Sequence, residues 1–350
     1  MPTIDLFCRV VDNYGDIGVC WRLARQLVAE HGCKVQLIVD DLAAFRFIAP
    51  EIYPALSQQK LLGVDVIAWR ISDSIQPAET VIEAFACDPP EEYVLAMAAL
   101  AEKPVWINLE YLSAEAWVDG VHGLPSPHPR LPLTKYFFCP GFTEKSGGLI
   151  REGELTSSPL RGEGWGEGDG GAGSHGETTE LLAFAYPHAP VRAFANALSA
   201  HVTTASRVDD ADPAWRSALP APQTQFDALL AQFDLLIVRG EDSFVRAQYA
   251  AKPFLWHIYP TPDDAHFVKL DAWLDHYCED LATDAARALR QAQQAFNRGE
   301  NNADAYANFA SHLPALKAHA THWRNHLFAQ TDLATRLLQF VNSLKKKKVS

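Results

Sequence analysis

Short apolar runs alternate with amphipathic segments along most of the chain. Residues 4–11 form the first apolar run, and apolar residues then recur at helical spacing over residues 19–31. This alternation predicts an α/β protein, in which helices cover both faces of a mostly parallel sheet. The remaining predicted strands are 35–39, 64–69, 80–86, 105–109, 181–186, 235–238 and 253–259, and the remaining predicted helices are 92–101, 191–199, 226–232, 244–251, 281–296 and 331–344.

One segment interrupts this alternation. Residues 151–179 are rich in glycine, serine and glutamate, a composition that buries too little apolar surface to offset its ordering entropy. We interpret it as a disordered, low-complexity insertion, with a functional lid as the alternative. It separates an N-terminal lobe, residues 1–150, from a C-terminal lobe, residues 180–330. We expect the last helix, residues 331–344, to pack back on the N-terminal lobe.

Composition narrows the class of protein. The formal net charge is -13 and the isoelectric point is near 5.4, which disfavours a nucleic-acid-binding protein. The chain lacks an apolar run of about 18 residues, the length that predicts a membrane span, and it lacks the pattern of a signal peptide. The six cysteines lack C-x-x-C spacing and are typical of buried thiols. We therefore expect a cytoplasmic protein that binds neither nucleic acid nor membrane.

Two carboxylates follow the first predicted strand. Asp12 and Asp16 lie at the carboxyl end of that strand, where open α/β sheets bind ligands. A carboxylate there can orient an acceptor or remove its proton. Asp16 could instead cap the next helix, and the sequence leaves that alternative open, whereas Asp12 precedes the turn. Gly15 and Gly18 do not form a G-x-G-x-x-G pattern, so a dinucleotide site has little support.

A similar strand-to-helix turn occurs late in the chain, at residues 239–243. The N–H groups at a helix N-terminus and the Ser243 hydroxyl form an anion site, and Arg239 can neutralise a diphosphate. Glu241 and Asp242 would be repelled by phosphate, so they should face hydroxyl groups of a sugar or base, or the acceptor. A plain capped helix is the alternative.

Two aromatic residues and three histidines are further candidates. Phe184 and Tyr186 lie two apart on a predicted strand, so their side chains share a face and could stack on a nucleobase. Core packing is the alternative. His319, His322 and His326 share a helical face, but no carboxylate at suitable spacing completes a metal site. We expect a solvated helix face there and no metal.

Longer runs of sequence carry a resemblance to a known family. Residues 10–27, 239–248 and 252–260 resemble signatures of the EarP family, the protein-arginine rhamnosyltransferases that modify bacterial elongation factor P. Residues 82–87 and 108–113 add to the match, which covers nearly the whole chain except the insertion. The resemblance implies a GT-B glycosyltransferase fold, with two Rossmann-like lobes facing across a cleft.

The same resemblance implies an activity and a set of residues. The activity is inverting, metal-independent transfer of L-rhamnose to one arginine of elongation factor P, which activates that factor for rescue of ribosomes stalled at polyproline. The donor substrate is dTDP-β-L-rhamnose, and no cofactor is implied. The positions that match catalytic residues are Asp12, Asp16 and Glu241. The positions assigned to donor binding are Phe184, Tyr186, Gln223, Arg239, Asp242, Ser243, Tyr259, Gly15 and Gly18.

Departures from the family pattern concern single donor contacts. Pro220 stands where the family often has an aromatic residue, and Thr261 stands where it tends to have glutamine. Two other functions remain as alternatives. One is a GT-B glycosyltransferase with a different acceptor. The other is a non-catalytic scaffold that binds a nucleotide sugar, which the presence of Asp12, Asp16 and Glu241 disfavours.

Overall fold

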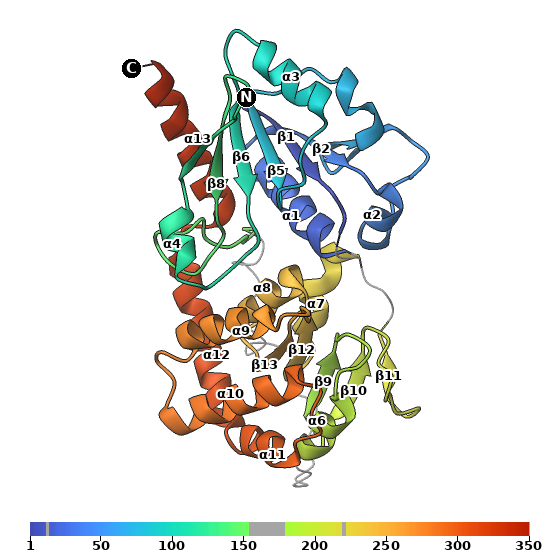
Figure 1. Ribbon diagram of the computed structural model, residues 1–350. Coiled ribbons are helices and arrows are strands. Elements are labelled where there is room, and N and C mark those ends of the chain that lie inside the picture. The colour runs from blue at the N-terminus through green and yellow to red at the C-terminus, as the bar shows by residue number, and fades with distance from the viewer. Residues whose placement is uncertain (12–13, 154–178, 219–221, 350) are drawn as a thin grey trace, which may run out of the picture. The chain divides into compact units, whose positions relative to one another are not determined.

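The computed structural model describes the chain apart from residues 12–13, 154–178, 219–221 and 350 (Figure 1). Asp12, Pro220 and nearly all of the predicted insertion therefore lie outside the described residues. The chain divides into two compact units. Unit 1 comprises Met1–Glu152 and Ala329–Ser350, and unit 2 comprises Gly153–Phe328.

Unit 1 is built on an eight-stranded sheet in the order β3-β4-β2-β1-β5-β6-β8-β7. The two edge pairs are antiparallel and the five inner pairs are parallel. The central strands carry almost only buried apolar residues, as strands covered on both faces must. The strands are β1 (Thr3–Cys8), β2 (Lys34–Val39), β3 (Gln58–Leu61), β4 (Val64–Ala68), β5 (Thr80–Ala84), β6 (Val105–Leu109), β7 (Pro125–Pro127) and β8 (Thr134–Phe138).

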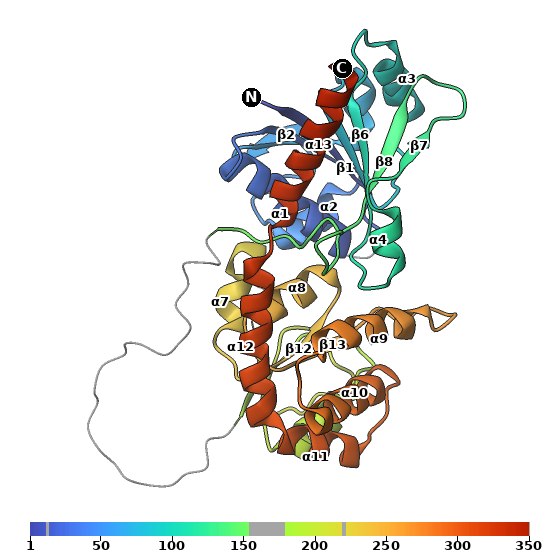
Figure 2. The same ribbon diagram turned by 90° about the vertical axis from the view of Figure 1, so that its left-hand side faces the viewer.

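Helices cover both faces of this sheet. The helices α1 and α13 pack side by side on one face, where their apolar residues form the larger core (Figure 2). The helix α3 covers the other face over a smaller core that contains Phe7, Tyr93 and Trp106. The helical elements are α1 (Gly15–Ala29), α2 (Leu42–Ile48), η1 (Trp69–Ser74), α3 (Glu91–Ala99), α4 (Trp117–Val121) and α13 (Leu333–Val349).

Unit 2 contains a five-stranded parallel sheet in the order β11-β10-β9-β12-β13. Its strands are β9 (Glu180–Ala183), β10 (His201–Thr204), β11 (Arg216–Ser217), β12 (Leu235–Arg239) and β13 (Phe254–His257). Its helical elements are α6 (Val191–Leu198), η2 (Gln223–Gln225), α7 (Phe226–Leu230), α8 (Glu241–Tyr249), α9 (Ala265–Tyr277), α10 (Thr283–Asn297), α11 (Ala303–Ser311) and α12 (Leu313–Ala329), the last of which ends at the unit boundary.

Buried polar and aromatic contacts join the helices of unit 2. The side-chain oxygen of Gln248 on α8 accepts hydrogen bonds from the indoles of Trp273 on α9, at 3.2 Å, and Trp323 on α12, at 2.8 Å. The ring of Phe194 on α6 meets those of Phe296 on α10 and Tyr306 on α11 edge-on. These contacts fix the helices around the sheet.

Two expectations from the composition can be compared with the structure. All six cysteines lie in the described part of the chain, and they are buried thiols rather than disulfides. Within the described residues, the helices all fall short of the length and apolar character needed to cross a membrane.

Candidate functional site

The predicted ligand-binding residues of unit 2 gather at the carboxyl end of its sheet. Strands β9 and β12 are neighbours, but the chain continues from β9 to β10 on one side and from β12 to β13 on the other. The crossovers therefore diverge between β9 and β12, and open α/β sheets bind ligands at such a point. Phe184 and Tyr186 follow β9 directly, and Arg239 is the last residue of β12.

The guanidinium of Arg239 lies against two aromatic rings. Its central carbon is 4.7 Å from the ring centre of Phe184 and 4.9 Å from that of Tyr186. Its Nη1 donates a hydrogen bond of 3.4 Å to the carbonyl of Ala185. A cation over the face of an aromatic ring is attracted by the ring quadrupole. The contacts therefore hold a half-buried positive charge at the end of the two central strands.

The two aromatic residues are not on a strand, so that part of the prediction is wrong. Strand β9 ends at Ala183, and three residues later the backbone N–H of Tyr186 donates to Nδ1 of His257, at 3.2 Å. Both rings nevertheless contact the same guanidinium, as residues that share a face would. Phe184 and Tyr186 are half-buried. They are therefore packed against neighbours while part of each ring is still accessible to a ligand.

The turn predicted at residues 239–243 is shorter than expected. Gly240 alone forms it, with φ +69° and ψ −179°, and α8 begins at Glu241. This backbone conformation is open to glycine and strained for other residues. Glu241, Asp242 and Ser243 form the first turn of α8, where the helix N–H groups and the macrodipole favour an anion. Gly240 is the N-cap residue of α8, so no side chain caps this helix.

Asp242 is the centre of a polar chain that reaches Gln223. Its Oδ2 accepts hydrogen bonds from Nε2 of Gln223, at 2.9 Å, and from Nε of Arg246, at 3.1 Å. Arg246 is buried and also pairs with Asp227 on α7. A buried cation between two carboxylates fixes both of them. Asp242 and Gln223 are therefore held together. Arg246, one helical turn after Asp242, was not predicted from the sequence.

His257, the last residue of β13, contacts Tyr186 through its ring and through a hydrogen bond. Burial lowers the pKa of its imidazole to about 4, and the positive charge of Arg239 adds to this effect. The ring is therefore neutral near pH 7, which leaves Nδ1 able to accept the N–H of Tyr186. Tyr259 follows two residues later, and its exposed ring lies 5.7 Å from that of Tyr186.

In unit 1, the candidate is Asp16. The helix α1 begins at Gly15 and its N-cap residue, Tyr14, makes no side-chain capping bond, so Asp16 is inside the helix and is not its cap. Its carboxylate is buried, with Oδ2 accepting the N–H of Val11 at 2.8 Å and Oδ1 accepting the hydroxyl of Tyr111 at 2.9 Å. Asp12, predicted beside it, lies outside the described residues.

Further polar residues missed by the sequence analysis lie at the end of β6, the strand that precedes Tyr111. Asn108, on β6, donates from Nδ2 to the Glu110 carboxylate at 2.5 Å and accepts the N–H of Ala86 at 3.1 Å. Burial raises the pKa of Glu110, and the bond from Asn108 opposes the rise. Tyr111 follows at the carboxyl end of the same strand. The sequence analysis used residues 108–113 only as evidence of a family resemblance. The position of Tyr111 after a predicted strand could have marked it as a candidate site residue.

Some predicted residues do not join either group. Gly15 and Gly18, assigned to donor binding, lie in the first turn of α1 in unit 1, where Gly18 donates its N–H to the carbonyl of Tyr14. The predicted solvated face of α12 is wrong for His319, which is buried and donates from Nε2 to the carbonyl of Tyr277.

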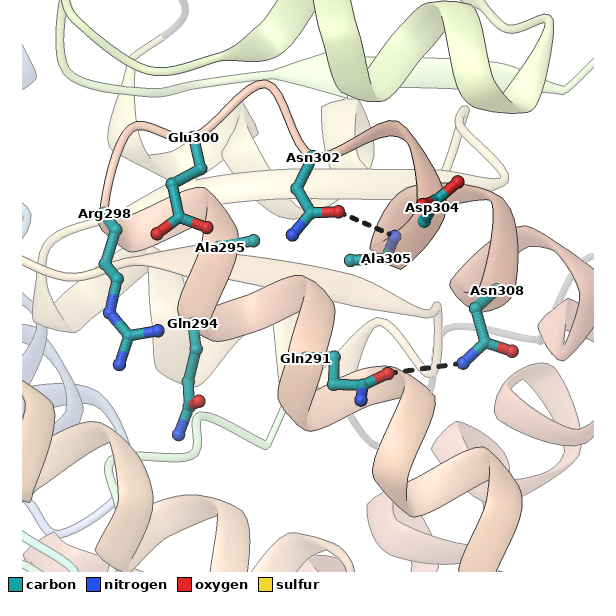
Figure 3. Close-up of a pocket in the computed structure, with 9 residues that line it drawn as sticks. All are labelled: Gln291, Gln294, Ala295, Arg298, Glu300, Asn302, Asp304, Ala305 and Asn308. Carbon is teal, nitrogen blue, oxygen red and sulfur yellow. Dashed lines mark hydrogen bonds between the residues drawn. The ribbon is translucent and has the colours of Figure 1, made fainter.

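A hollow in unit 2 lies away from these residues. It has a volume of about 470 Å³ and lies between α10 and α11 (Figure 3). Its lining is almost wholly polar, and Asn302 caps α11 there by accepting the N–H of Ala305. None of the residues that line it was predicted from the sequence to bind a ligand. Hydrogen bonds among its own side chains account for much of its polarity.

Comparison with known proteins places the chain among glycosyltransferases. The family profile described as "Elongation-Factor P (EF-P) rhamnosyltransferase EarP" matches residues 4–211 and 215–342. A protein-arginine rhamnosyltransferase of Pseudomonas putida is 44% identical over 378 residues, which cover 98% of this chain and 99% of the relative. A solved structure described as the structural basis for EarP-mediated arginine glycosylation of translation elongation factor EF-P is 31% identical, covers 98% of this chain and 99% of that one, and has a TM-score of 0.62.

More distant structures have the same fold. The calicheamicin glycosyltransferase CalG4 is 12% identical, covers 97% of this chain and 98% of its own, and has a TM-score of 0.51. Together with the two parallel sheets described above, these likenesses confirm the predicted GT-B class with two Rossmann-like lobes.

Proposed function

The chain belongs to the EarP family of elongation factor P rhamnosyltransferases, and on that premise we propose that it transfers L-rhamnose from dTDP-β-L-rhamnose to one arginine of elongation factor P. Family membership makes it an enzyme of the protein-arginine rhamnosyltransferase type. The donor and the inverting course of the reaction are our proposal, as is the acceptor arginine. The observation that carries most weight for arginine is the buried carboxylate of Asp16, held by a backbone N–H and a tyrosine hydroxyl.

The acceptor sets the chemical problem. A guanidinium has a pKa above about 12, and its charged, delocalised nitrogens are poor nucleophiles. A fixed carboxylate can accept hydrogen bonds from the guanidinium fork and take a proton as the new bond forms. In the proposed reaction Asp16 is that base and Asp12 orients the guanidinium. The bonds from Val11 and Tyr111 each hold one oxygen of the Asp16 carboxylate, which fixes the orientation of the proposed base.

Bond making and bond breaking then balance at the anomeric carbon. One guanidinium nitrogen forms a bond to that carbon, while the bond from the carbon to the diphosphate oxygen breaks. The proton from nitrogen passes to the Asp16 carboxylate, and dTDP leaves with the electron pair of the broken bond. Attack opposite the leaving group inverts the β-linked donor to an α-linked product. No metal takes part in this scheme.

Unit 2 supplies the groups that stabilise the leaving diphosphate. Arg239 brings a guanidinium that two rings already orient, and the first turn of α8 brings helix N–H groups. The hydroxyls of Ser243 and Tyr259 are proposed as further donors. Phe184 and Tyr186 would stack on the base. Gln223 and Asp242, joined by a hydrogen bond of 2.9 Å, would bind base or sugar groups, and Glu241 would position the donor sugar.

The experiment is the intact mass of elongation factor P after incubation with this enzyme and dTDP-β-L-rhamnose. We expect a gain of one deoxyhexose at a single arginine. Asp16→Asn should abolish the gain while donor binding stays near the wild-type level, because Asp16 lies in unit 1 and the donor groups lie in unit 2. Loss of donor affinity in step with turnover would contradict the assignment of Asp16.

A matched variant and two further outcomes complete the design. Asp65→Asn replaces a carboxylate of the same unit that lies 3.4 Å from Lys60 on an edge hairpin, and it should keep full activity. Donor binding without a mass gain would favour a glycosyltransferase with another acceptor. Absence of both would favour a non-catalytic scaffold.

A further inference from the structure

The turn after β5 has an uncommon backbone. Phe85, Ala86 and Asp88 have φ angles of +60°, +51° and +48°, a region that side chains other than glycine rarely adopt. Such conformations persist only where the surrounding structure imposes them, and they are frequent at functional sites. The turn follows β5, which pairs with β1. The chain continues from β1 to β2 on one side of the sheet and from β5 to β6 on the other, and open α/β sheets bind ligands at such a point.

The neighbouring strand β6 holds this turn in place. The N–H of Phe85 donates to the carbonyl of Leu109 at 2.7 Å, and the N–H of Ala86 donates to Oδ1 of Asn108 at 3.1 Å. Asn108 is buried, so its amide has few alternative partners. The left-handed backbone is therefore fixed by the strand that ends just before Tyr111.

The turn also determines where the Tyr111 ring lies. The ring of Phe85 stacks on that of Tyr111, with centres 4.1 Å apart and planes 11° from parallel. The Tyr111 hydroxyl then donates to Oδ1 of Asp16 at 2.9 Å. Tyr111 is 41% exposed, which is high for a residue whose hydroxyl holds a buried carboxylate. An unbroken series of contacts thus runs from the strained turn to Asp16.

Unit 1 contains a second tyrosine–aspartate pair that serves as a comparison. The hydroxyl of Tyr93, on α3, donates to Oδ2 of Asp5, on β1. Both residues are buried in the sheet core, and Asp5 also accepts the N–H of Ala78 at 2.9 Å. This pair has the same chemistry as Tyr111 and Asp16, but it lies among core residues, so it is structural.

We propose that Tyr111 is a positioning residue for the reaction, and that it acts by holding the Asp16 carboxylate in the orientation that receives the acceptor's proton. The inference rests on the proposed function of Asp16 as the base. Phe85, and through it the turn after β5, fixes the Tyr111 ring. The backbone N–H of Val11 holds the other oxygen of Asp16, so the two bonds act on opposite sides of the carboxylate.

The expected kinetic effect follows from this arrangement. Tyr111→Phe keeps the ring and its stack but removes the hydrogen bond to Oδ1. The carboxylate then loses one of the contacts that fix its orientation, so kcat should fall about 10- to 100-fold. The KM values for donor and acceptor should stay within about twofold of wild type, because the hydroxyl acts on the base rather than on either substrate.

The test measures kcat, both KM values and thermal stability for a set of variants. Wild type and Asp16→Asn establish the proposed function. Tyr93→Phe should lower Tm and leave kcat unchanged. Tyr111→Phe should lower kcat and leave Tm unchanged. Phe85→Leu should lower kcat because the stack is lost, and the conservative Phe85→Tyr should restore it.

Each outcome decides the matter. Tyr111→Phe with a kcat within about twofold of wild type, while Asp16→Asn is inactive, overturns the positioning role and leaves the proposed function intact. A fall in kcat accompanied by a fall in Tm as large as that of Tyr93→Phe, or by a matching rise in KM, also overturns it, since the role would then be structural or in binding. A wild-type protein that transfers no sugar overturns both proposals together.

Discussion

Replacing His257 by asparagine should reduce the loss of unfolding free energy that unit 2 shows when the pH is lowered. The folded protein lowers the pKa of this imidazole from the ordinary value of 6.5 to about 4, through burial first and then through Arg239, His266 and His188. The unfolded chain therefore binds the proton at a higher pH than the folded one. The stability that depends on neutral His257 is fully present above about pH 6.5 and is lost as the pH falls to about 4. Below that pH the imidazole is protonated in both states.

The size of the effect follows from the pKa difference. Each pKa unit corresponds to about 1.4 kcal/mol, so the full effect is roughly 3 kcal/mol and the part expressed between about pH 7 and pH 5 is roughly 2 kcal/mol. Asparagine can place Oδ1 near the position of Nδ1 and accept the N–H of Tyr186, but it does not titrate in this range. The variant should thus lose less stability on acidification, whatever its stability at neutral pH.

The assay is urea denaturation at about pH 7 and about pH 5, followed by tryptophan fluorescence. The quantity compared is the loss of unfolding free energy between the two pH values, because other titrating groups contribute equally to wild type and variant. His201→Asn is the matched control, since His201 lies on the surface of the same unit with its side chain 62% exposed, 3.3 Å from Glu180. It should follow wild type within about 0.5 kcal/mol. Equal losses for wild type and His257→Asn would refute the reasoning.

Two further predictions concern the turn that follows β12. Arg239→Lys keeps the charge but loses the planar group that contacts two rings, so the Kd for dTDP-β-L-rhamnose by calorimetry should rise about 3- to 10-fold; an unchanged Kd would contradict the role of the guanidinium plane. Gly240→Ala should cost about 1 to 3 kcal/mol, seen as a lower Tm, because of its φ of +69° and ψ of −179°. Among the described residues, apart from the chain neighbours of Gly240, no atom lies within 4 Å of the added Cβ, so a Tm equal to wild type would mean that the backbone conformation is not strained.

The apolar pattern predicted the buried strands well and their polar neighbours poorly. Strand β6 has the predicted bounds because every one of its residues is buried. The edge strand β3 was missed because its sequence, Gln-Gln-Lys-Leu, has no apolar run, and its pairing with β4 decides its conformation. The short strand β10 was missed as well. Local pattern is therefore informative where burial alone determines structure.

Helix starts and site contacts show the same limit. We expected α1 to begin at Val19, but it begins at Gly15. Glycine has a low helix propensity, and contacts of Asp16 with Val11 and with the distant Tyr111 override it. The identity of Asp16 as a site candidate could be predicted from its place after a strand. Its partner Tyr111 could not, since the two are 95 positions apart and only the sheet brings them together.

The return of the last helix to unit 1 has a consequence for how the chain is made. Residues of α13 are buried in the same core as α1, and Gln26 donates to Oδ1 of Asp332, 306 positions later, at 3.1 Å. The ribosome therefore releases the first strands of unit 1 long before the helix that covers them. At about 5 to 20 residues per second, synthesis of the 306 residues between these positions takes roughly 15 to 60 s, and during that time α13 does not yet cover the core face beside α1. The N-terminal part of this chain should depend on chaperones during synthesis more than a contiguous domain of equal size, and a truncation before α13 should leave it insoluble.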